Sequence, residues 1–344
     1  METRRESRPA HGEATPPSRR AVLQWLGSAT AASMAATVCH PAWAQSDASF
    51  PSRPVRLIVG FAPGGAADAL ARIIAQGLST ELRQQVIVDN KPGAEGILAA
   101  QALMAAPADG HTLMLGTNTA MVSVPLLRPA APYDPFKQFT PISTAGQFSM
   151  FLLVPASFPA RNVSEFLAEI SRKPGLYNSA SSNSASELAM LQLLGKERKV
   201  TNVRYKGDVP AMTDLVGGQI QMLFTTGTTA PGFVKDGRAR ALLTLQNERS
   251  ALLPDVPTAR EAGLGDLTIL PWAGFFGPAH MPAPIANSLS QALQKALQQP
   301  AVKQQLSLQG FDGYGMTPER FTAFFRNQYD TFGRIVREFN VKFE

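Results

Sequence analysis

Cysteine and histidine are scarce in this sequence, which has one Cys and four His among 344 residues. So few side chains cannot build a disulfide framework, and they argue against a zinc site. Charge is also sparse: Asp, Glu, Lys and Arg make up 17% of the chain, and the net charge of +6 is spread along it without basic blocks. Because nucleic-acid binding needs a concentrated basic surface, we expect no nucleic-acid partner. Because Cys and His are so few, we also expect no bound metal.

Hydrophobic residues, by contrast, make up 44% of the chain. This proportion excludes an intrinsically disordered, collagen-like or coiled-coil protein. At this length, two domains of ordinary size are a better expectation than one large core.

Residues 1–44 have the pattern of an export signal. Residues 18–23 resemble a twin-arginine motif, and residues 21–39 form an uncharged run that ends before the small residues Ala42 and Ala44. This pattern predicts cleavage before Gln45 and a periplasmic protein. A transmembrane anchor is the alternative, but the run is short and is interrupted by Ser and Thr.

Short apolar runs alternate with helical patterns in the rest of the chain. We expect a first series with strands at residues 55–59, 85–88 and 112–115 and helices from Ala66 and over 97–104. A second series has expected strands at 150–154, 177–180, 201–205 and 220–224, and helices from Val163, over 187–194 and from Pro210. The tail adds a strand at 268–276 and two helices, the last with a packing face of Phe321, Phe324, Phe325 and Phe332. Such alternation predicts βαβ units and parallel sheets.

Two of these helices begin directly after turns of small or polar residues, at Ala66 and near Ser184. The first N–H groups of a helix have no internal acceptor, and the helix dipole places partial positive charge there, so both starts could bind a carboxylate. Asp68 and Glu187 fit the role of first-turn acids, and Ser184 with Glu187 has capping-box spacing, as Asn162 has with Glu165. A Gly pair that merely turns the chain is the alternative interpretation of the first turn.

Several ordered motifs point to one family. They are residues 61–65 (FAPGG) with Asp68 and Arg72, 91–96 (KPGAEG), 108–113 (ADGHTL), 133–135 (YDP), 139–142 (FTPI), 204–207 (RYKG), 254–258 (PDVPT), 261–263 (EAG) and the segment around Trp272. In order and spacing they resemble the substrate-binding proteins of tripartite tricarboxylate transporters, also called Bug receptors. The resemblance covers essentially the whole chain after the leader.

The resemblance implies a type II-like periplasmic-binding-protein fold: two α/β lobes with mainly parallel sheets flanked by helices and a ligand cleft between them. The chain would cross twice, giving lobe 1 as residues 45–147 plus 251–344 and lobe 2 as residues 148–250. The implied ligand-binding residues are those of a first carboxylate loop, of a nearby strand end, of an opposing loop and of the far wall: Phe61, Ala62, Pro63, Gly64, Gly65 and Ala66; Asn118 and Thr119; Ser181, Ser182, Asn183, Ser184 and Ser186; Tyr205 and Thr226.

The second loop departs from the family pattern. Residues 181–184 read SSNS where glycines are usual, and Glu187 stands at the position of a His. A carboxylate there would repel an anionic ligand unless it points away into its cap, so a monoacid or a ligand with a polar, uncharged far end becomes an alternative to a diacid. Asn183 could supply the left-handed backbone of a glycine.

The leading functional hypothesis is a monomeric periplasmic receptor, without catalysis or cofactor, that closes around a small organic carboxylate. Its partners would be membrane transporter subunits of the tripartite tricarboxylate type. One alternative is a secreted serine hydrolase, for which the chain has no Gly-x-Ser-x-Gly elbow and only His111 or His280 as a histidine base after the leader. Another is a ligand sensor for a membrane signalling partner. Dicarboxylates, tricarboxylates, aromatic acids and amino acids all remain open as ligands.

Overall fold

The computed structural model describes residues 50–341 except residues 129, 206, 266 and 270. The predicted export signal and the cleavage before Gln45 lie outside the described residues. Within the described part of the chain, no helix is both long enough and apolar enough to cross a membrane.

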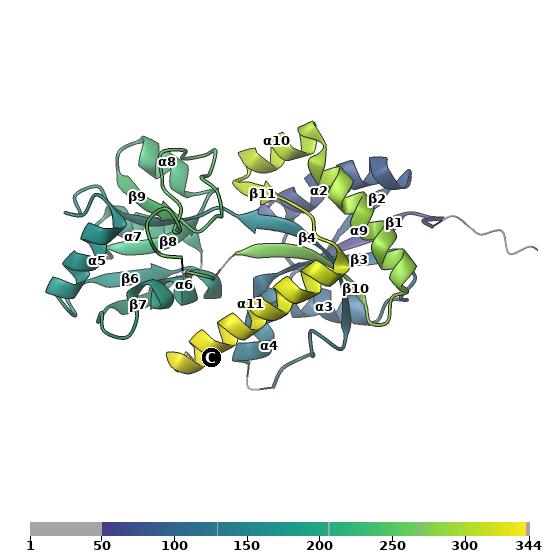
Figure 1. Ribbon diagram of the computed structural model, residues 1–344, viewed down its shortest axis with the longest axis horizontal. Helices are drawn as coiled ribbons and strands as arrows, with labels where there is room; N and C mark the ends of the chain where they lie inside the picture. The colour runs from purple at the N-terminus through teal and green to yellow at the C-terminus, as the bar shows by residue number, and fades with distance from the viewer. Residues whose placement is uncertain (1–49, 129, 206, 266, 270, 342–344) are drawn as a thin grey trace, which may run out of the picture. The chain divides into compact units, whose positions relative to one another are not determined.

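Two β-sheets organise the described chain (Figure 1). The first sheet has six strands, in the sheet order β11 (Phe311–Gly313), β4 (Phe139–Phe148), β10 (Trp272–Pro278), β3 (Thr112–Thr117), β1 (Val55–Val59) and β2 (Val86–Asn90). The second has five strands, in the order β7 (Thr201–Arg204), β6 (Asn178–Ser181), β8 (Met222–Thr226), β5 (Met150–Pro155) and β9 (Ala239–Thr244). The two predicted α/β series therefore form two separate sheets.

The helical elements of the first half of the chain are α2 (Ala66–Leu82), η1 (Ala94–Gly96), α3 (Ile97–Met104), the π-helical turn η2 (Thr119–Ser123) and α4 (Val124–Leu127). The middle of the chain adds α5 (Val163–Arg172), α6 (Ser184–Leu194), α7 (Asp208–Val216) and α8 (Ala230–Lys235). The tail forms α9 (Ala283–Gln298), α10 (Pro300–Leu308) and α11 (Pro318–Glu338). Helices start at Ala66 and Val163 as predicted, whereas Pro210 is the third residue of α7 rather than its first.

The chain passes between the sheets twice. Strand β4 leads through Ser149 directly into β5, and the segment after β9 returns to β10 of the first sheet. We propose that the lobe boundaries follow these crossings, with residues 45–147 and 251–344 in lobe 1 and residues 148–250 in lobe 2.

The sheets are mixed, which corrects the expectation of mainly parallel sheets. Strands β2, β1 and β3 pair in parallel, as do β7, β6 and β8. In each sheet, however, the strand that arrives from the other lobe is inserted antiparallel between two neighbours: β10 lies between β3 and β4, and β5 lies between β8 and β9. These crossing strands are not the product of a βαβ unit, so nothing imposes the parallel direction on them.

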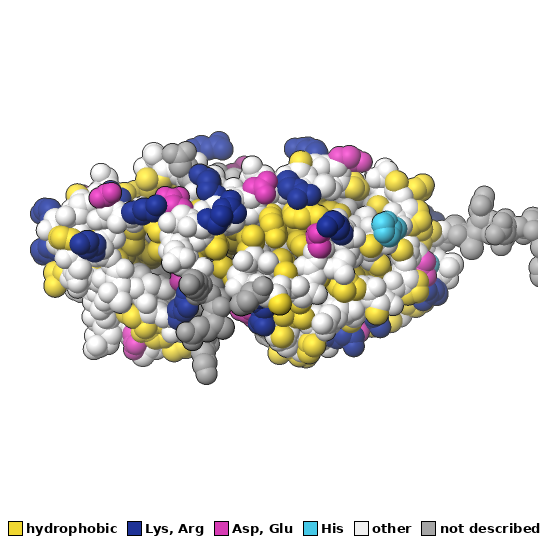
Figure 2. All heavy atoms as spheres, turned by 90° about the horizontal axis from the view of Figure 1, so that it is seen from below, with side chains coloured by type: hydrophobic (Ala, Val, Ile, Leu, Met, Phe, Trp, Pro, Cys, Tyr) yellow, Lys and Arg dark blue, Asp and Glu magenta, His cyan; other side chains and the backbone are white. Residues whose placement is uncertain are grey.

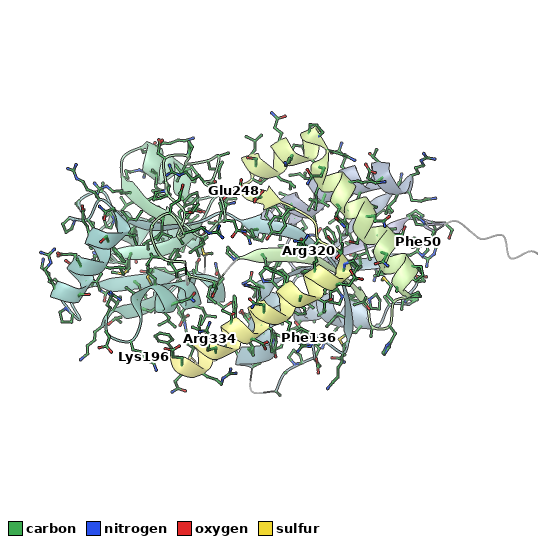
Figure 3. The ribbon with its side chains drawn as sticks, viewed as in Figure 1. Phe50, Phe136, Lys196, Glu248, Arg320 and Arg334 are labelled. Atoms are coloured by element: carbon green, nitrogen blue, oxygen red, sulfur yellow. The ribbon has the colours of Figure 1, made fainter. Side chains whose placement is uncertain are left out.

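Helix α11 packs on the first sheet through its phenylalanines. Phe321, Phe325 and Phe332 are fully buried, and the rings of Phe321 and Phe325 meet Trp272 edge-on at centroid distances of 5.8 and 5.7 Å. The predicted packing face of this helix is confirmed. Near its end, Glu338 forms a 3.9 Å ion pair with Lys196, which follows α6 (Figure 3). Helix α11 therefore also contacts the second lobe.

Candidate functional site

A cavity of about 630 Å³ lies between residues of the two lobes. Ten of the predicted ligand-binding residues line it: Phe61, Ala62, Pro63, Gly64, Gly65, Ala66, Asn118, Thr119, Asn183 and Thr226. The wall also contains Ala67, Thr117, Phe148, Ser149, Met150, Ala185, Gly227, Thr228, Pro271, Gln309 and Gly310. Its volume is in the range that accommodates small organic molecules.

The first loop presents an open helix start to this cavity. Gly65 is the N-cap of α2, with extended backbone and no side chain that could cap the helix. The amides of Ala66 and Ala67 therefore have no intrahelical acceptor, and no side chain of the described residues caps this helix start by a hydrogen bond. The helix dipole adds partial positive charge at the same place. This end of the cavity can accept an anion without a charged side chain.

Asp68 and Asn90 hold the first loop in shape. The Asp68 carboxylate accepts hydrogen bonds from the Gly64 amide at 2.9 Å, from Arg72 Nε at 3.0 Å and from Asn90 Nδ2 at 2.9 Å. Asn90 Nδ2 also donates to the carbonyl of Phe61 at 3.0 Å. Gly64 has a left-handed backbone, with a φ of +82°, which suits a glycine. Its amide is already bound, so Gly64 lines the cavity without a free donor.

The contacts of Asp68 predict an acid-dependent contribution to stability. The hydrogen bond from Arg72, followed by those from Gly64 and Asn90, lowers the pKa of Asp68 from 3.8 to about 2 against the effect of burial. The pKa of Asp68 is therefore lower in the folded protein than in the unfolded chain. The Asp68 charge contributes its full stabilisation of the folded state above a pH of about 4, and this stabilisation is lost as the pH falls toward about 2.

We therefore expect Asp68→Asn to be less stable than the wild type near neutral pH, and we expect this difference to shrink between pH about 4 and about 2. Urea unfolding of both proteins across this pH range measures the difference. A difference that is unchanged from neutral pH down to pH about 2 would contradict the assigned role of the Asp68 charge.

Two buried polar groups beside the open helix start have no partner among the described residues. Asn118 is 4% exposed and its Nδ2 has no acceptor, and Thr117 is 5% exposed with an unpartnered hydroxyl. Both line the cavity at the end of β3, where the π-helical turn η2 begins. Leaving a buried donor unsatisfied costs about 1–3 kcal/mol. Both atoms are shielded from the cavity in this arrangement, so a ligand would satisfy them only after a small rotation of the two side chains.

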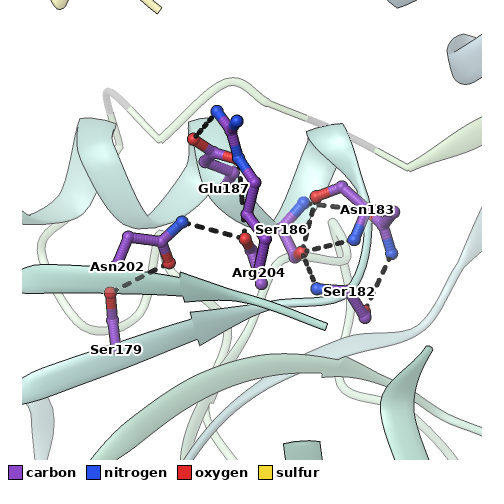
Figure 4. A network of polar contacts seen from close by, with 8 residues as sticks. Ser179, Ser182, Asn183, Ser186, Glu187, Asn202 and Arg204 are labelled. Carbon is purple, nitrogen blue, oxygen red and sulfur yellow. Dashed lines mark hydrogen bonds and ion pairs between the residues drawn. The ribbon is translucent and has the colours of Figure 1, made fainter. Parts of the chain in front are cut away.

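The start of α6 faces the cavity from lobe 2, but its side chains cap it (Figure 4). Asn183 Oδ1 accepts from the Ser186 amide at 2.9 Å, and Ser186 Oγ accepts from the Asn183 amide at 3.3 Å. The predicted capping pair of Ser184 with Glu187 is therefore wrong, because the capping box forms one residue earlier. The expected left-handed backbone of Asn183 is also wrong, since its φ of −159° is extended, as an N-cap requires.

Glu187 turns toward strand β7. Its carboxylate oxygens accept from Arg204 Nε at 2.9 Å and from Arg204 Nη2 at 2.8 Å, and Ser181 Oγ donates to it at 3.5 Å (Figure 4). Asn202 supports the network from β7 through a 2.9 Å hydrogen bond from its Nδ2 to Ser181 Oγ. The negative charge of Glu187 is thus matched by an arginine, which removes the ground for expecting it to repel a ligand.

Five predicted ligand-binding residues do not line the cavity, because their side chains bond elsewhere. The Ser181 hydroxyl contacts Glu187 and Asn202, and Ser186 belongs to the capping box. The hydroxyl of Ser182 donates to Asp208. Ser184 Oγ donates to Ser123 Oγ at 2.7 Å, a contact between the lobes.

Tyr205 is the fifth of these residues. Its hydroxyl donates to Asp214 Oδ2 at 2.6 Å, and this hydrogen bond raises the pKa of Tyr205 to about 12. Tyr205 therefore remains a neutral phenol that is bound within lobe 2. The structure does not bring it to the cavity wall.

The comparisons with known proteins identify the family. Residues 70–341 match the family described as the tripartite tricarboxylate transporter family receptor. The chain belongs to this family. It is 30% identical over 298 residues to the protein BugT of Bordetella pertussis, an alignment that covers 86% of this chain and 91% of BugT.

Two solved structures of family relatives contain carboxylates. MatC from Rhodopseudomonas palustris with bound malate has a TM-score of 0.64 and 32% identity, and the match covers 83% of this chain and 100% of MatC. Rpa4515 from R. palustris with adipate has a TM-score of 0.71 and 26% identity, and the match covers 85% of this chain and 99% of Rpa4515. These matches confirm the two-lobed periplasmic-binding-protein fold. The family is one of solute-binding receptors and not of enzymes, so the hydrolase alternative has no support from them.

Sequence reasoning missed the parts of the receptor's cavity wall that lie where the chain changes lobes. Phe148, Ser149 and Met150 form the crossing from β4 to β5, and Pro271 directly precedes β10. Gln309 and Gly310 approach from the end of α10, where the Gly310 carbonyl accepts from the Ser149 amide at 2.6 Å. The predicted lobe boundary near residue 148 could have indicated Phe148, Ser149 and Met150 as cavity residues, because segments that cross between lobes border the cleft. No motif indicated Gln309 or Gly310.

Proposed function

We propose that this protein is a periplasmic receptor that binds a small organic carboxylate in the cavity between its lobes and delivers it to a tripartite tricarboxylate-type transporter. The observation that carries the proposal is the juxtaposition of the open α2 start with the unpartnered Asn118 amide and Thr117 hydroxyl. A carboxylate has two oxygens and about four acceptor positions, which matches the backbone amides of Ala66 and Ala67 together with Asn118 Nδ2. Malate and adipate in MatC and Rpa4515 support the same ligand class.

Binding would favour the closed arrangement of the lobes. A ligand held at the α2 start would contact Phe148, Met150 and Asn183 across the cavity, so it would stabilise the state in which both walls are close. A hydrogen bond from Ser184 Oγ to Ser123 Oγ already joins the two lobes. We also propose export by residues 1–44, removal of this leader before Gln45, and a monomeric receptor.

The test uses the chain from Gln45 to Glu344 and a panel of organic acids. A bound acid raises the melting temperature by mass action, and closure reduces the radius of gyration measured by small-angle X-ray scattering. We expect at least one acid to do both. A broad panel of mono-, di- and tricarboxylates that changes neither quantity would refute the proposed function.

Asn118→Leu should separate ligand binding from folding. The substitution removes a buried donor that has no partner among the described residues, so the ligand-free protein should melt at an unchanged or higher temperature. Affinity for the carboxylate should fall about 10-fold, because one hydrogen bond to a charged acceptor is lost. Isothermal titration measures the affinity.

Asn287→Leu is the matched control, since Asn287 is exposed on α9 and lies away from this cavity. The control should bind like the wild type. Equal affinity of Asn118→Leu and Asn287→Leu would mean that Asn118 does not contact the ligand.

A further inference from the structure

From the two ends of the cavity we infer the class of its ligand: a monocarboxylate with an apolar body, bound by its single anionic group at the α2 start. This inference rests on the proposed function and narrows it. It separates this receptor from relatives that hold the dicarboxylates malate and adipate.

The cavity wall is uncharged. Among the described residues, no Asp, Glu, Lys, Arg or His lines it. Its middle is formed by apolar side chains, with Phe61 and Phe148 half-buried and Met150 fully buried beside Pro271. Burial of apolar ligand surface against such a wall is favourable, whereas an unpaired carboxylate in the same place is strongly unfavourable. The ligand body should therefore be apolar. Figure 2 shows one face of the molecule, on which apolar side chains gather near the middle with Lys and Arg around them.

The lobe 2 end of the cavity offers few free donors for a second carboxylate. The Ser186 amide at the start of α6 is bound by Asn183 Oδ1 at 2.9 Å. The amide of Thr226 donates to Asp208 Oδ2 at 3.0 Å, and the Thr226 hydroxyl donates to the same oxygen at 2.6 Å. The Ser186 amide and both Thr226 donors are thus already committed within the protein, which leaves the amides of Ser184 and Ala185 in the first turn of α6 as donors of this end.

Asp208 also makes this end electrostatically unfavourable for an anion. Its carboxylate accepts from Ser182 Oγ and from Thr226, and it forms no ion pair with any described residue. A second ligand carboxylate placed against Thr226 would lie close to this like charge in a partly buried site, where repulsion is screened less than in water. Glu187 does not add to this repulsion, because Arg204 balances it.

Matched acid pairs test the inference. We propose titrations of butyrate against succinate, hexanoate against adipate, and benzoate against terephthalate, since each pair differs by one carboxylate on a similar body. The monoacid of the best-binding pair should bind at least about 10-fold more tightly, which corresponds to about 1.4 kcal/mol. A diacid that binds equally or more tightly would overturn the inference while the proposed function stands. No binding by any of these or other acids would instead refute the proposed function.

Thr228→Lys tests the position of the uncharged end. Thr228 is exposed, lines the cavity from lobe 2 and contacts Thr226 Oγ1 through its hydroxyl at 2.9 Å, so a lysine there would offer a cation to a second carboxylate. The monoacid-to-diacid affinity ratio should fall at least about 10-fold. Thr213→Lys, at an exposed position of α7, adds the same charge to lobe 2 away from the cavity and should leave the ratio unchanged.

Asp208→Asn provides a second, independent variant. The Asn oxygen can still accept from Thr226 or Ser182, so the fold should survive while the negative charge is removed. Diacids should gain affinity relative to monoacids, although less than in Thr228→Lys. If both folded variants keep the wild-type ratio, the lobe 2 end is not where the far end of the ligand lies, and the inference fails.

Discussion

Gly65→Asp should abolish carboxylate capture and leave the ligand-free protein as stable as the wild type, or slightly more stable. Gly65 has an ordinary negative φ, and a Cβ at this position would lie 3.5 Å from the carbonyl oxygen of Ala62, which is normal contact. An Asp at an N-cap accepts hydrogen bonds from the amides of the first helical turn. Its carboxylate would therefore occupy the donors that the ligand needs, and its charge would repel an anionic ligand.

The expected loss of affinity is at least about 100-fold, because two hydrogen bonds to a charged acceptor are worth about 1.5–3 kcal/mol each. Titration calorimetry measures the affinity, and the melting temperature without ligand reports the fold. Gly65→Asn caps the helix without a charge and should give a smaller loss. Gly232→Asp introduces the same residue at an exposed, sterically open position of α8 and should bind normally. Retained affinity in a folded Gly65→Asp would show that the α2 start does not hold the ligand.

The first loop could be predicted from the sequence because its interactions are local. Strand β1, the glycines and the start of α2 follow one another within about a dozen residues, and Asp68 occupies the first turn of the helix that it braces. The apolar spacing, the glycine-containing turn before it and the acid in the first turn together predicted the start of this helix. The sequence did not predict the hydrogen bond from the Gly64 amide to Asp68. Arg72 and Asn90 can also donate to this carboxylate, and the sequence does not show which of these donors will bind it.

The second loop was predicted less well for a physical reason. Residues 181–184 and Ser186 are nearly all able to cap a helix, so local preference does not decide between Asn183 and Ser184 as the N-cap. In the structure Asn183 is the N-cap, and the Glu187 carboxylate is paired with Arg204 of β7, a residue distant in sequence from the helix start. The far wall presents the same difficulty, because Phe148, Pro271 and Gln309 meet only after the chain has crossed between the sheets twice.

Arg204→Met should destabilise the protein and also weaken carboxylate binding. The Glu187 side chain is 9% exposed and loses two hydrogen bonds, of 2.9 and 2.8 Å, from its guanidinium partner. Removing one member of a buried ion pair costs about 3–5 kcal/mol, but Arg204 is itself 47% exposed, so water can replace part of the lost contact. We expect a loss of about 2 kcal/mol in the free energy of unfolding, measured by urea denaturation.

The double variant decides whether charge is the cause. In Arg204→Met the unpaired Glu187 carboxylate remains in the first turn of α6, where it should reduce affinity for an anion several-fold. Glu187→Gln combined with Arg204→Met removes that charge and should restore most of the affinity and at least about 1 kcal/mol of the stability, as expected for coupled residues in contact. If the losses of affinity and of stability in the double variant equal the sum of those in the two single variants, the Arg204 side chain stabilises the second loop only through packing and not through its charge.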